Sequence, residues 1–233
     1  MKEIKNSDVT VVIPTLNEER SIAEVIREIR HLGFHSIVVI DGNSKDETVK
    51  IAEEFGVDII IQNGRGKGTA LRQVFNHSGL NGDAIVMMDA DGSMNPKEIP
   101  GLIMALNSES DLAKGARFLS YGYSEDLNLI RRIGNLFFVL LVNCFWSANY
   151  KDLCYGFAAF RKGAIKKLYP HLKSRNFEIE AEIFIKAKKL GLKVIEVPSI
   201  ELRRKYGKSN LNAFKDGLQI FKTIVREFIR PGL

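Results

Sequence analysis

Two aspartates separated by one residue, Asp89 and Asp91, are the side chains in this sequence with the clearest chemical potential. They follow directly after Ile-Val-Met-Met (85–88), an apolar run that predicts a buried β-strand. In open α/β sheets, ligands bind in the crevice beyond the carboxyl ends of the strands. Two carboxylates at such an edge can hold Mg²⁺ or Mn²⁺ and leave coordination positions for a diphosphate. The alternative is a solvated turn.

Three more turns with polar or glycine-rich sequence end predicted strands, at residues 14–18, 41–44 and 64–68. Asn17 and Glu18 stand at a predicted helix start, where backbone N–H groups are free, although simple capping also explains Asn17. Asp41 can accept hydrogen bonds from a base or a ribose, or serve only as a turn residue. In Gly-Arg-Gly-Lys-Gly (64–68) the backbone can approach a ligand and Lys67 can meet a phosphate. This turn matches neither the P-loop motif nor Gly-x-Gly-x-x-Gly.

The elements that must position these turns alternate regularly in the first half of the chain. Predicted strands cover 9–13, 36–40, 57–61, 83–88 and 111–115. Between them lie predicted helices at 19–32, after Ser44 with a Ser44/Glu47 capping box, from the glycine-rich turn to 76, and from Pro96 to 107. Near-continuous apolar strands alternating with helices predict an α/β fold with a mainly parallel sheet covered on both faces. All four turns would then open on one edge of the sheet.

The second half is less regular. It predicts helices at 126–146, 161–169, 177–190 and 212–230 and strands at 154–160 and 193–197. Without an evident linker or repeat, we interpret residues 1–233 as a single domain. The polar N-terminal start lacks a signal-peptide pattern, and the spacing of Cys144 and Cys154 matches no metal motif, so a reduced cytoplasmic protein is expected.

Charge is distributed unevenly along the chain. Residues 1–110 carry 11 basic and 17 acidic residues, whereas residues 111–233 carry 23 basic and 11 acidic residues. A basic second half predicts contact with an anionic partner: a phosphate-bearing substrate, an anionic membrane surface or nucleic acid. Nucleic acid is not expected, because ribonucleoprotein-type aromatic motifs and zinc spacing are missing.

Two apolar segments of the second half suit a membrane surface. The run 136–146 is preceded by Arg131 and Arg132, which favours a core helix or a membrane-lying helix over a membrane span. The closing helix combines aromatic residues with Lys and Arg, as interfacial helices do, although a packed core helix gives the same pattern.

Taken together, the motifs resemble family 2 glycosyltransferases of the GT-A fold, and among them the dolichyl- or polyprenyl-phosphate sugar synthases. The resemblance runs in family order over nearly the whole chain. Its main segments are Val-Val-Ile-Pro-Thr-Leu-Asn-Glu (11–18), Val-Ile-Asp-Gly-Asn-Ser-Lys-Asp-Glu-Thr (39–48), Gly-Lys-Gly-Thr-Ala-Leu-Arg (66–72), Met-Asp-Ala-Asp-Gly-Ser (88–93), Lys-Gly-Ala-Arg-Phe (114–118), Gly-Phe-Ala-Ala-Phe-Arg (156–161), Glu-Val-Pro (196–198), Arg-Lys-Tyr-Gly-Lys-Ser-Asn-Leu (204–211) and Asp-Gly-Leu-Gln-Ile (216–220).

The resemblance implies roles for particular residues. Residues 1–115 would form the nucleotide-sugar and metal-binding half, 116–211 the acceptor-binding half and 212–233 an amphipathic helix. The implied donor-binding residues are Pro14, Thr15, Asn17, Glu18, Asp41, Gly42, Lys67, Gly68 and Asp89. The implied metal ligands are Asp89, Asp91 and Ser93, and the implied acceptor-phosphate ligands are Arg117, Arg131, Arg203 and Arg204.

The implied reaction transfers a hexose, mannose or glucose, from a GDP- or UDP-sugar to a polyprenyl or dolichyl phosphate with inversion at the anomeric carbon. A divalent cation would offset the charge that builds on the departing diphosphate. A phosphate acceptor is already anionic near pH 7, so positioning by Arg117 would dominate. A soluble or polysaccharide hydroxyl acceptor would instead need a carboxylate base, for which Asp152, Glu178 and Glu180 are candidates. A nucleic-acid-binding module without activity is the remote alternative.

Overall fold

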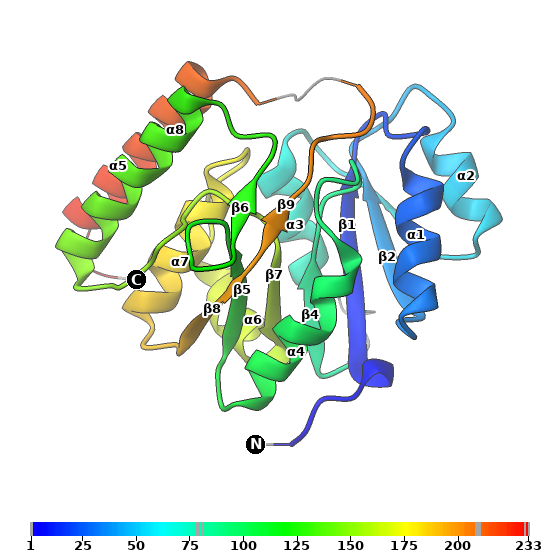
Figure 1. Cartoon of the computed structure of the whole chain (residues 1–233), viewed down its shortest axis with the longest axis horizontal. Helices are drawn as coiled ribbons and strands as arrows, with labels where there is room; N and C mark the ends of the chain where they lie inside the picture. Colours follow the sequence, from blue (N-terminus) through cyan, green and yellow to red (C-terminus); the bar gives the residue numbers. More distant parts are fainter. Residues whose placement is uncertain (1, 78–79, 81, 208–210, 231, 233) are drawn as a thin grey trace.

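A seven-stranded sheet with the order β3-β2-β1-β4-β7-β5-β8 organises the computed structural model, which describes residues 2–77, 80, 82–207, 211–230 and 232. Figure 1 shows the sheet and its helices. The strands are β1 (Val9–Thr15), β2 (Ser36–Asp41), β3 (Asp58–Ile61), β4 (Ala84–Met87), β5 (Leu112–Ala116), β7 (Ala158–Arg161) and β8 (Val194–Pro198). The helices are α1 (Ile22–His31), α2 (Thr48–Glu54), α3 (Lys67–Phe75), α4 (Ile99–Asn107), α5 (Leu129–Trp146), α6 (Lys162–Leu168), α7 (Ile179–Lys189) and α8 (Ala213–Ile229). Short 3₁₀ turns cover Asn6–Asp8, Pro96–Glu98 and Tyr169–His171.

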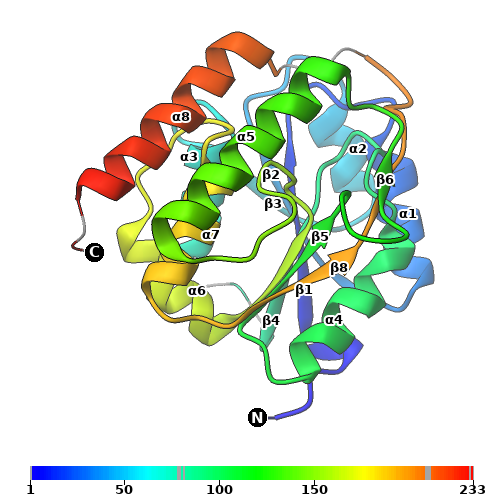
Figure 2. The same cartoon turned by 60° about the vertical axis from the view of Figure 1, so that its left-hand side comes forward.

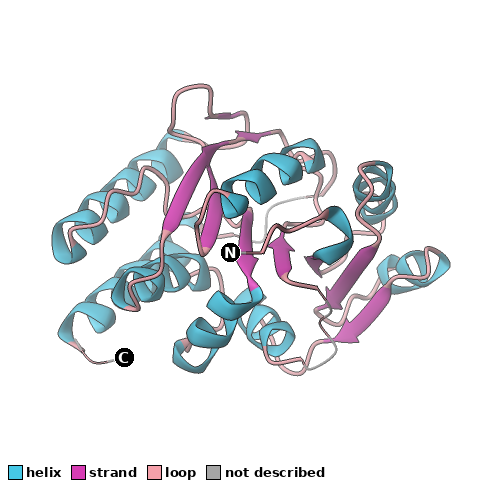
Figure 3. Cartoon of the chain, turned by 90° about the horizontal axis from the view of Figure 1, so that it is seen from below, coloured by secondary structure: helices cyan, strands magenta, loops and turns pink. Residues whose placement is uncertain are grey.

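Helices cover both faces of the sheet, because successive strand residues point to opposite sides. Val12 packs into a core with residues of α3, α5, α6, α7 and α8. Its neighbours Val11 and Ile13 pack into a second core, with residues of α1, α2 and α4. Figure 3 shows the strands between these helical layers. The apolar strands are therefore buried on both sides, as predicted.

The sheet is mainly parallel, with one exception that the sequence did not predict. Strands β1 to β4 pair in parallel, and so do β5 and β8. Strand β7 is antiparallel to both of its neighbours, β4 and β5. It begins at Ala158, whereas the predicted strand began at Cys154, because residues 154–157 form the loop that reaches the sheet edge. The mixed α/β architecture confirms the predicted fold class.

Two local predictions differ from the structure. Ser44 does not cap a helix, because α2 begins four residues later at Thr48 with Glu47 at its N-cap. The Ser44 hydroxyl instead donates to Oδ1 of Asp41. A second small sheet, formed by β6 (Tyr123–Ser124) and β9 (Ile200–Glu201), was not predicted from the sequence. Strands of two residues are too short to show the alternation of apolar and polar residues from which a strand is predicted.

Helices α5 and α8 lie side by side on one side of the molecule (Figure 1, Figure 2). Phe145 and Phe228 stack with ring centroids 4.2 Å apart, which joins the two helices near their carboxyl ends. Their outer faces are open: Leu129 of α5 is 71% exposed and Phe214 of α8 is 78% exposed. Each helix packs its inner face into the core, with Val142 of α5 and Ile224 of α8 fully buried, while its outer face stays exposed. By length and composition alone, α5 is the one helix of the described residues that is able to cross a membrane.

Candidate active site

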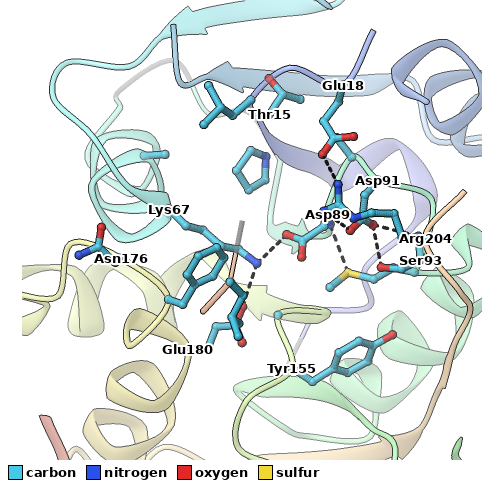
Figure 4. Close-up of a pocket in the computed structure, with 18 of the residues that line it drawn as sticks. Thr15, Glu18, Lys67, Asp89, Asp91, Ser93, Tyr155, Asn176, Glu180 and Arg204 are labelled. Atoms are coloured by element: carbon cyan, nitrogen blue, oxygen red, sulfur yellow. Dashed lines mark hydrogen bonds and ion pairs between the residues drawn. The ribbon is translucent and has the colours of Figure 1, made fainter. Parts of the chain in front are cut away.

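A pocket of about 430 Å³ opens at the carboxyl ends of β1, β2 and β4. Figure 4 shows the side chains around it. All four predicted strand-end turns contribute to its lining, although the 41–44 turn contributes Gly42 alone. The predicted site residues that line the pocket are Pro14, Thr15, Glu18, Gly42, Lys67, Asp89, Asp91, Ser93, Arg117, Arg131 and Arg204.

Asp89 lies against a buried lysine. The Nζ atom of Lys67 is 2.6 Å from Oδ1 of Asp89 and 2.8 Å from Oε1 of Glu180 (Figure 4). Burial raises the pKa of the Asp89 carboxyl to about 6, with Lys67 opposing the rise and Asp91 adding to it. Burial lowers the Lys67 pKa, but Asp89 and Glu180 outweigh burial and raise it. The lysine is therefore held charged between two acids at the centre of the pocket.

Asp91 is held by the turn that follows it and by an arginine from a distant segment. Its Oδ1 accepts hydrogen bonds from the backbone N–H of Ser93 at 2.9 Å and from the Ser93 hydroxyl at 2.7 Å. Its Oδ2 is 2.8 Å from Nη2 of Arg204. Arg204 also reaches Glu18, with 2.9 Å between Nη1 and Oε1. Ser93 thus lies beside Asp91, and its role as a metal ligand stays a prediction.

The donor set at this edge fits a cation that shares its coordination with a substrate. Within the described part of the chain, no group of three or more His, Cys, Asp and Glu side chains is arranged to hold a metal ion. Asp89 and Asp91 are hard oxygen donors from one short turn, and both face the pocket. Mg²⁺ is commonly held by one or two carboxylates, with water and phosphate oxygens completing the shell. Two acids are sufficient for that kind of site.

The glycine-rich turn approaches the pocket because it packs closely against another backbone. Gly66 has φ 93°, and a Cβ there would lie 2.3 Å from the carbonyl oxygen of Arg175. A Cβ on Gly68 would lie 2.6 Å from the carbonyl oxygen of Ser174. Only glycine fits these two positions. Gly68 does not line the pocket, so this predicted donor residue lies behind it as a packing residue.

Two other predicted donor residues shape the turns without lining the pocket. Asp41 is buried and accepts hydrogen bonds from the Thr15 hydroxyl at 3.3 Å and from the backbone N–H of Ser44 at 2.8 Å. Asn17 has φ 56° and accepts from the backbone N–H of Lys45 at 2.7 Å. The Asp41 contacts correspond to the turn role that was its alternative to ligand binding. Asn17 does not cap α1, whose N-cap is Ser21, but joins the 14–18 turn to the backbone of Lys45.

The four predicted acceptor arginines have different environments. Arg131 lines the pocket at the start of α5, with 3.3 Å between its Nη1 and Oδ2 of Asp126. Arg204 lines the pocket beside Asp91. Arg203 is exposed and does not line the pocket. Arg117 lines it, but is buried and heavily hydrogen-bonded within the protein.

Arg117 and Asp152 form a buried pair. Nε of Arg117 is 2.7 Å from Oδ2 of Asp152, and Nη2 is 2.9 Å from Oδ1. The remaining contacts of Arg117 reach Oε2 of Glu201 at 3.0 Å and the carbonyl of Cys154 at 2.9 Å. Burial raises the pKa of Asp152, but Arg117 outweighs burial and lowers it. Asp152 does not line the pocket and its carboxylate is held by Arg117, so the conditional role as a general base forms no part of the function proposed below.

Three glutamates at the start of α7, two of them candidate bases, have the sequence pattern of solvated surface charge. Glu178, Glu180 and Glu182 are all buried. Glu180 lines the pocket and pairs with Lys67, whereas Glu182 accepts hydrogen bonds from the backbone N–H groups of Lys173 and Ser174. The spacing of apolar residues could not predict the burial of these acids, because a periodic pattern assigns charged residues to the exposed face of a helix.

Several pocket residues were not predicted to have a role in the site. They are Leu16, Gln62, Arg65, Gly66, Ala70, Ala90, Met94, Asp126, Cys154, Tyr155, Gly156, Asn176, Phe177, Glu201 and Leu211. Gln62 ends a predicted strand beside Asp41 and could have been found by the strand-end rule. Asn176 and Phe177 come from a segment of the second half that approaches the glycine-rich turn only in three dimensions. Residues 208–210 of the predicted 204–211 motif lie outside the described residues.

The mixed α/β fold is that of glycosyltransferases of the GT-A type, and comparison with known proteins identifies the family. The sequence model described as Glycosyl transferase family 2 matches residues 10–169, more than half of the chain. The chain therefore belongs to glycosyl transferase family 2, which confirms the predicted enzyme class.

Relatives and solved structures agree with this assignment. A dolichyl-phosphate hexose transferase of Haloferax volcanii is 29% identical over 235 residues, covering 100% of this chain and 99% of the relative. A dolichol-phosphate mannosyltransferase of Pyrococcus furiosus is 32% identical, covering 87% of this chain and 59% of the relative. The crystal structure of glucosyl-3-phosphoglycerate synthase from Mycobacterium tuberculosis, in complex with Mn²⁺, UDP and phosphoglyceric acid, aligns with a TM-score of 0.75 at 22% identity. That alignment covers 95% of this chain and 78% of the other, and it confirms the fold.

Proposed function

We propose that this protein transfers a hexose from a UDP- or GDP-sugar to a polyprenyl or dolichyl phosphate at a membrane surface. The single observation that carries the proposal is that the acid-lined pocket lies at the beginning of two exposed apolar helices. Arg131 of α5 lines the pocket, and so does Leu211, two residues before α8 begins. A water-soluble donor and a membrane-borne acceptor would meet at such a junction. The names of the Haloferax and Pyrococcus relatives support this acceptor class.

The donor half of the site is proposed at the carboxyl ends of β1 to β4. Asp89 and Asp91, with the Ser93 hydroxyl nearby, would hold Mg²⁺ or Mn²⁺. The bound cation would act as a Lewis acid that stabilises the charge on the departing diphosphate. Lys67 and Arg204 would add positive charge on either side of the acid pair, and Pro14, Thr15 and Gly42 would line the nucleoside position. The backbone and side chains of this chain orient the donor before the reaction begins.

The acceptor half of the site is proposed around Arg131. An acceptor phosphate carries its own negative charge near pH 7 and needs no general base. Arg131 is half-buried in the pocket wall and has one carboxylate contact, to Asp126. Arg117 is already neutralised by Asp152 and Glu201, so we assign it mainly to holding the pocket floor. Arg203 is left without a role.

The membrane contact is proposed on the outer faces of α5 and α8. Exposed apolar residues on these two helices are Leu129, Ile130, Ile133, Leu136, Phe137, Leu140, Phe214, Leu218, Phe221, Phe228 and Ile229. A contiguous apolar face of this kind marks an interaction site. The opposite face of α5 is tied into the domain, since Oδ1 of buried Asn135 accepts from the backbone N–H groups of Leu153 and Cys154. This attachment favours a helix that lies on the cytoplasmic membrane surface over a helix that crosses it.

A donor panel tests the proposal. The purified chain is incubated with Mn²⁺, polyprenyl phosphate in detergent and, in turn, UDP-glucose, UDP-N-acetylglucosamine, GDP-mannose and GDP-glucose, and the lipid product is identified by mass. One of the hexosyl donors is expected to give a polyprenyl-phosphate hexose. Transfer to soluble hydroxyl acceptors, with none to polyprenyl phosphate, would instead support the hydroxyl-acceptor alternative.

A further inference from the structure

The segment of residues 173–176, hereafter the donor-loop support, forms the surface on which the amino terminus of α3 rests. The backbone N–H of Thr69 donates to the carbonyl of Arg175 at 3.0 Å. Nη1 of Arg72 donates to the carbonyl of Lys173 at 3.4 Å. Gly66 and Gly68 are packed against the same segment so closely that neither position has room for a Cβ. The first residue of α3 is Lys67, so the position of the donor-loop support sets the position of this pocket lysine.

Two buried glutamates of the α7 region hold the donor-loop support through its backbone. Oε1 of Glu178 accepts from the N–H groups of Arg175 at 3.0 Å and Asn176 at 3.2 Å. Oε2 of Glu182 accepts from the N–H groups of Lys173 at 2.9 Å and Ser174 at 2.8 Å. Glu182 is fully buried at 0% exposure. A buried carboxylate is costly unless a cation and hydrogen bonds compensate it.

The compensating cation for Glu182 comes from α8. Nη2 of Arg226 lies 2.5 Å from Oε1 of Glu182, and the Arg226 side chain is 32% exposed. Helix α7 packs against α8 on one side and against α3 on another. No residue of α8 is among those that line the pocket. The contact between Arg226 and Glu182 is therefore a link from the exposed helix to the donor-loop support.

We propose that Glu182, held by Arg226, is a positioning residue for donor binding. Arg226 fixes the Glu182 carboxylate, Glu182 fixes the donor-loop support, and the donor-loop support fixes the glycine-rich turn with Lys67. Helix α8 then has two roles, contact with the membrane on its outer face and preorganisation of the donor site on its inner face. This inference rests on the proposed function, because it requires a nucleotide-sugar donor in the pocket.

The test measures binding of UDP and of GDP, each with Mn²⁺, to the full chain by titration calorimetry. Arg226→Gln is expected to raise the Kd of whichever nucleotide binds by about 10-fold, which corresponds to one charge-assisted hydrogen bond. Lys222→Gln is the matched control, because Lys222 is exposed on the same helix and the substitution removes the same charge. The Kd of the nucleotide for Lys222→Gln is expected to stay within about 2-fold of the wild-type value, because surface substitutions have small effects.

Kinetics separate a positioning role from general damage. Arg226→Gln is expected to raise the KM for the donor while kcat at saturating donor and the KM for the acceptor stay unchanged, because only donor binding depends on the support. If Arg226→Gln does not fold, Arg226→Lys provides the test. It keeps the charge and loses the planar guanidinium contact, so the Kd is expected to rise about 3-fold.

Two outcomes overturn different claims. Wild-type protein that binds neither nucleotide would contradict the proposed function itself. Wild-type protein that binds a nucleotide, with a folded Arg226 variant that binds it equally well, would overturn only the positioning role of Glu182 and Arg226.

Discussion

The guanidinium of Arg204 lies against the carboxylate of Asp91, with 2.8 Å between Nη2 and Oδ2. The pair joins the segment after β9 to the turn after β4, two parts of the chain that are distant in sequence. Asp91 and Glu18 both raise the pKa of Arg204 and outweigh the lowering by burial. Arg204 is thus a permanently charged group beside the proposed metal site. We expect it to exchange its contact with Asp91 for one with a phosphate oxygen of the bound donor.

Replacing Arg204 by alanine should therefore weaken catalysis at the donor site. Loss of a charge-assisted contact corresponds to about 10- to 100-fold in kcat/KM. Arg203→Ala is the control, because Arg203 is exposed beside Arg204 but does not line the pocket. Steady-state kinetics with the active donor measure both variants. Equal losses in the two variants would contradict a specific role for Arg204.

Arg117→Ala is expected to reduce stability strongly. The substitution leaves Asp152 and Glu201 buried without their cation, and breaking a buried ion pair costs about 3–5 kcal/mol. Urea unfolding followed by circular dichroism measures the free energy of unfolding. A variant that is as stable as the wild type, with a raised KM for the acceptor alone, would instead favour the predicted acceptor-phosphate role.

Glu227 of α8 should make a contribution to stability that depends on pH. Burial raises the pKa of its carboxyl, but the hydrogen bond and charge of Lys186, 2.6 Å away, outweigh burial and lower it. Since the folded pKa lies below the unfolded one, the stabilisation is present above the unfolded pKa of about 4.3 and is lost as the pH falls through the folded value.

Glu227→Gln tests this pH dependence. The variant should be less stable than the wild type by about 3 kcal/mol at pH 7, because Lys186 is left buried without its partner. The difference should shrink as the pH falls below 4, where the wild-type carboxyl is also neutral. Unfolding curves at several pH values measure it, and a difference that stays constant between pH 7 and pH 3 would count against the Lys186 pair as its source.

Acidic substitutions on the outer face of α5 should prevent membrane binding. Leu129→Glu combined with Ile133→Glu places two carboxylates among exposed apolar side chains, and anionic vesicles repel them. Co-sedimentation with vesicles containing phosphatidylserine is expected to fall at least about 10-fold, since each nearby charge is worth about 1 kcal/mol at such a surface. Met104→Glu is the control, because Met104 is 71% exposed on α4, away from this face. Equal binding by the double variant and the control would exclude α5 as the contact.

The sequence was sufficient to predict the first half of the fold because its strands are buried on both faces. The apolar runs before Pro14, Asp41 and Asp89 can be recognised as strands without knowing which strands they pair with. The carboxyl ends of parallel strands lie at the same edge of the sheet, so the residues that follow these runs are expected to lie close together. Most predicted strand-end residues accordingly line one pocket. Asp41 lies behind the pocket, since a turn aspartate and a ligand-binding aspartate have the same sequence pattern.

The second half was less predictable because its interactions join residues that are distant in the chain. The buried acids of α7 have the spacing of surface charges, and only the fold reveals that Glu182 meets the 173–176 backbone and Arg226. Arg117 likewise matched a motif position, whereas its partner Asp152 is 35 residues further along the chain. The pattern of one helix does not predict such pairs.

The proposal that Asp89 and Asp91 hold a catalytic divalent cation is tested most directly by the dependence of sugar transfer on the metal and on Asp91. Sugar transfer is measured for the wild type before chelation, after chelation and after addition of Mn²⁺, alongside Asp91→Asn with and without Mn²⁺. Activity of the wild type should be lost with the chelator and return with Mn²⁺, and Asp91→Asn should remain at least about 100-fold less active throughout, consistent with several kcal/mol of charge stabilisation. Full activity of the chelated enzyme, or of Asp91→Asn, would contradict the assignment of the acid pair.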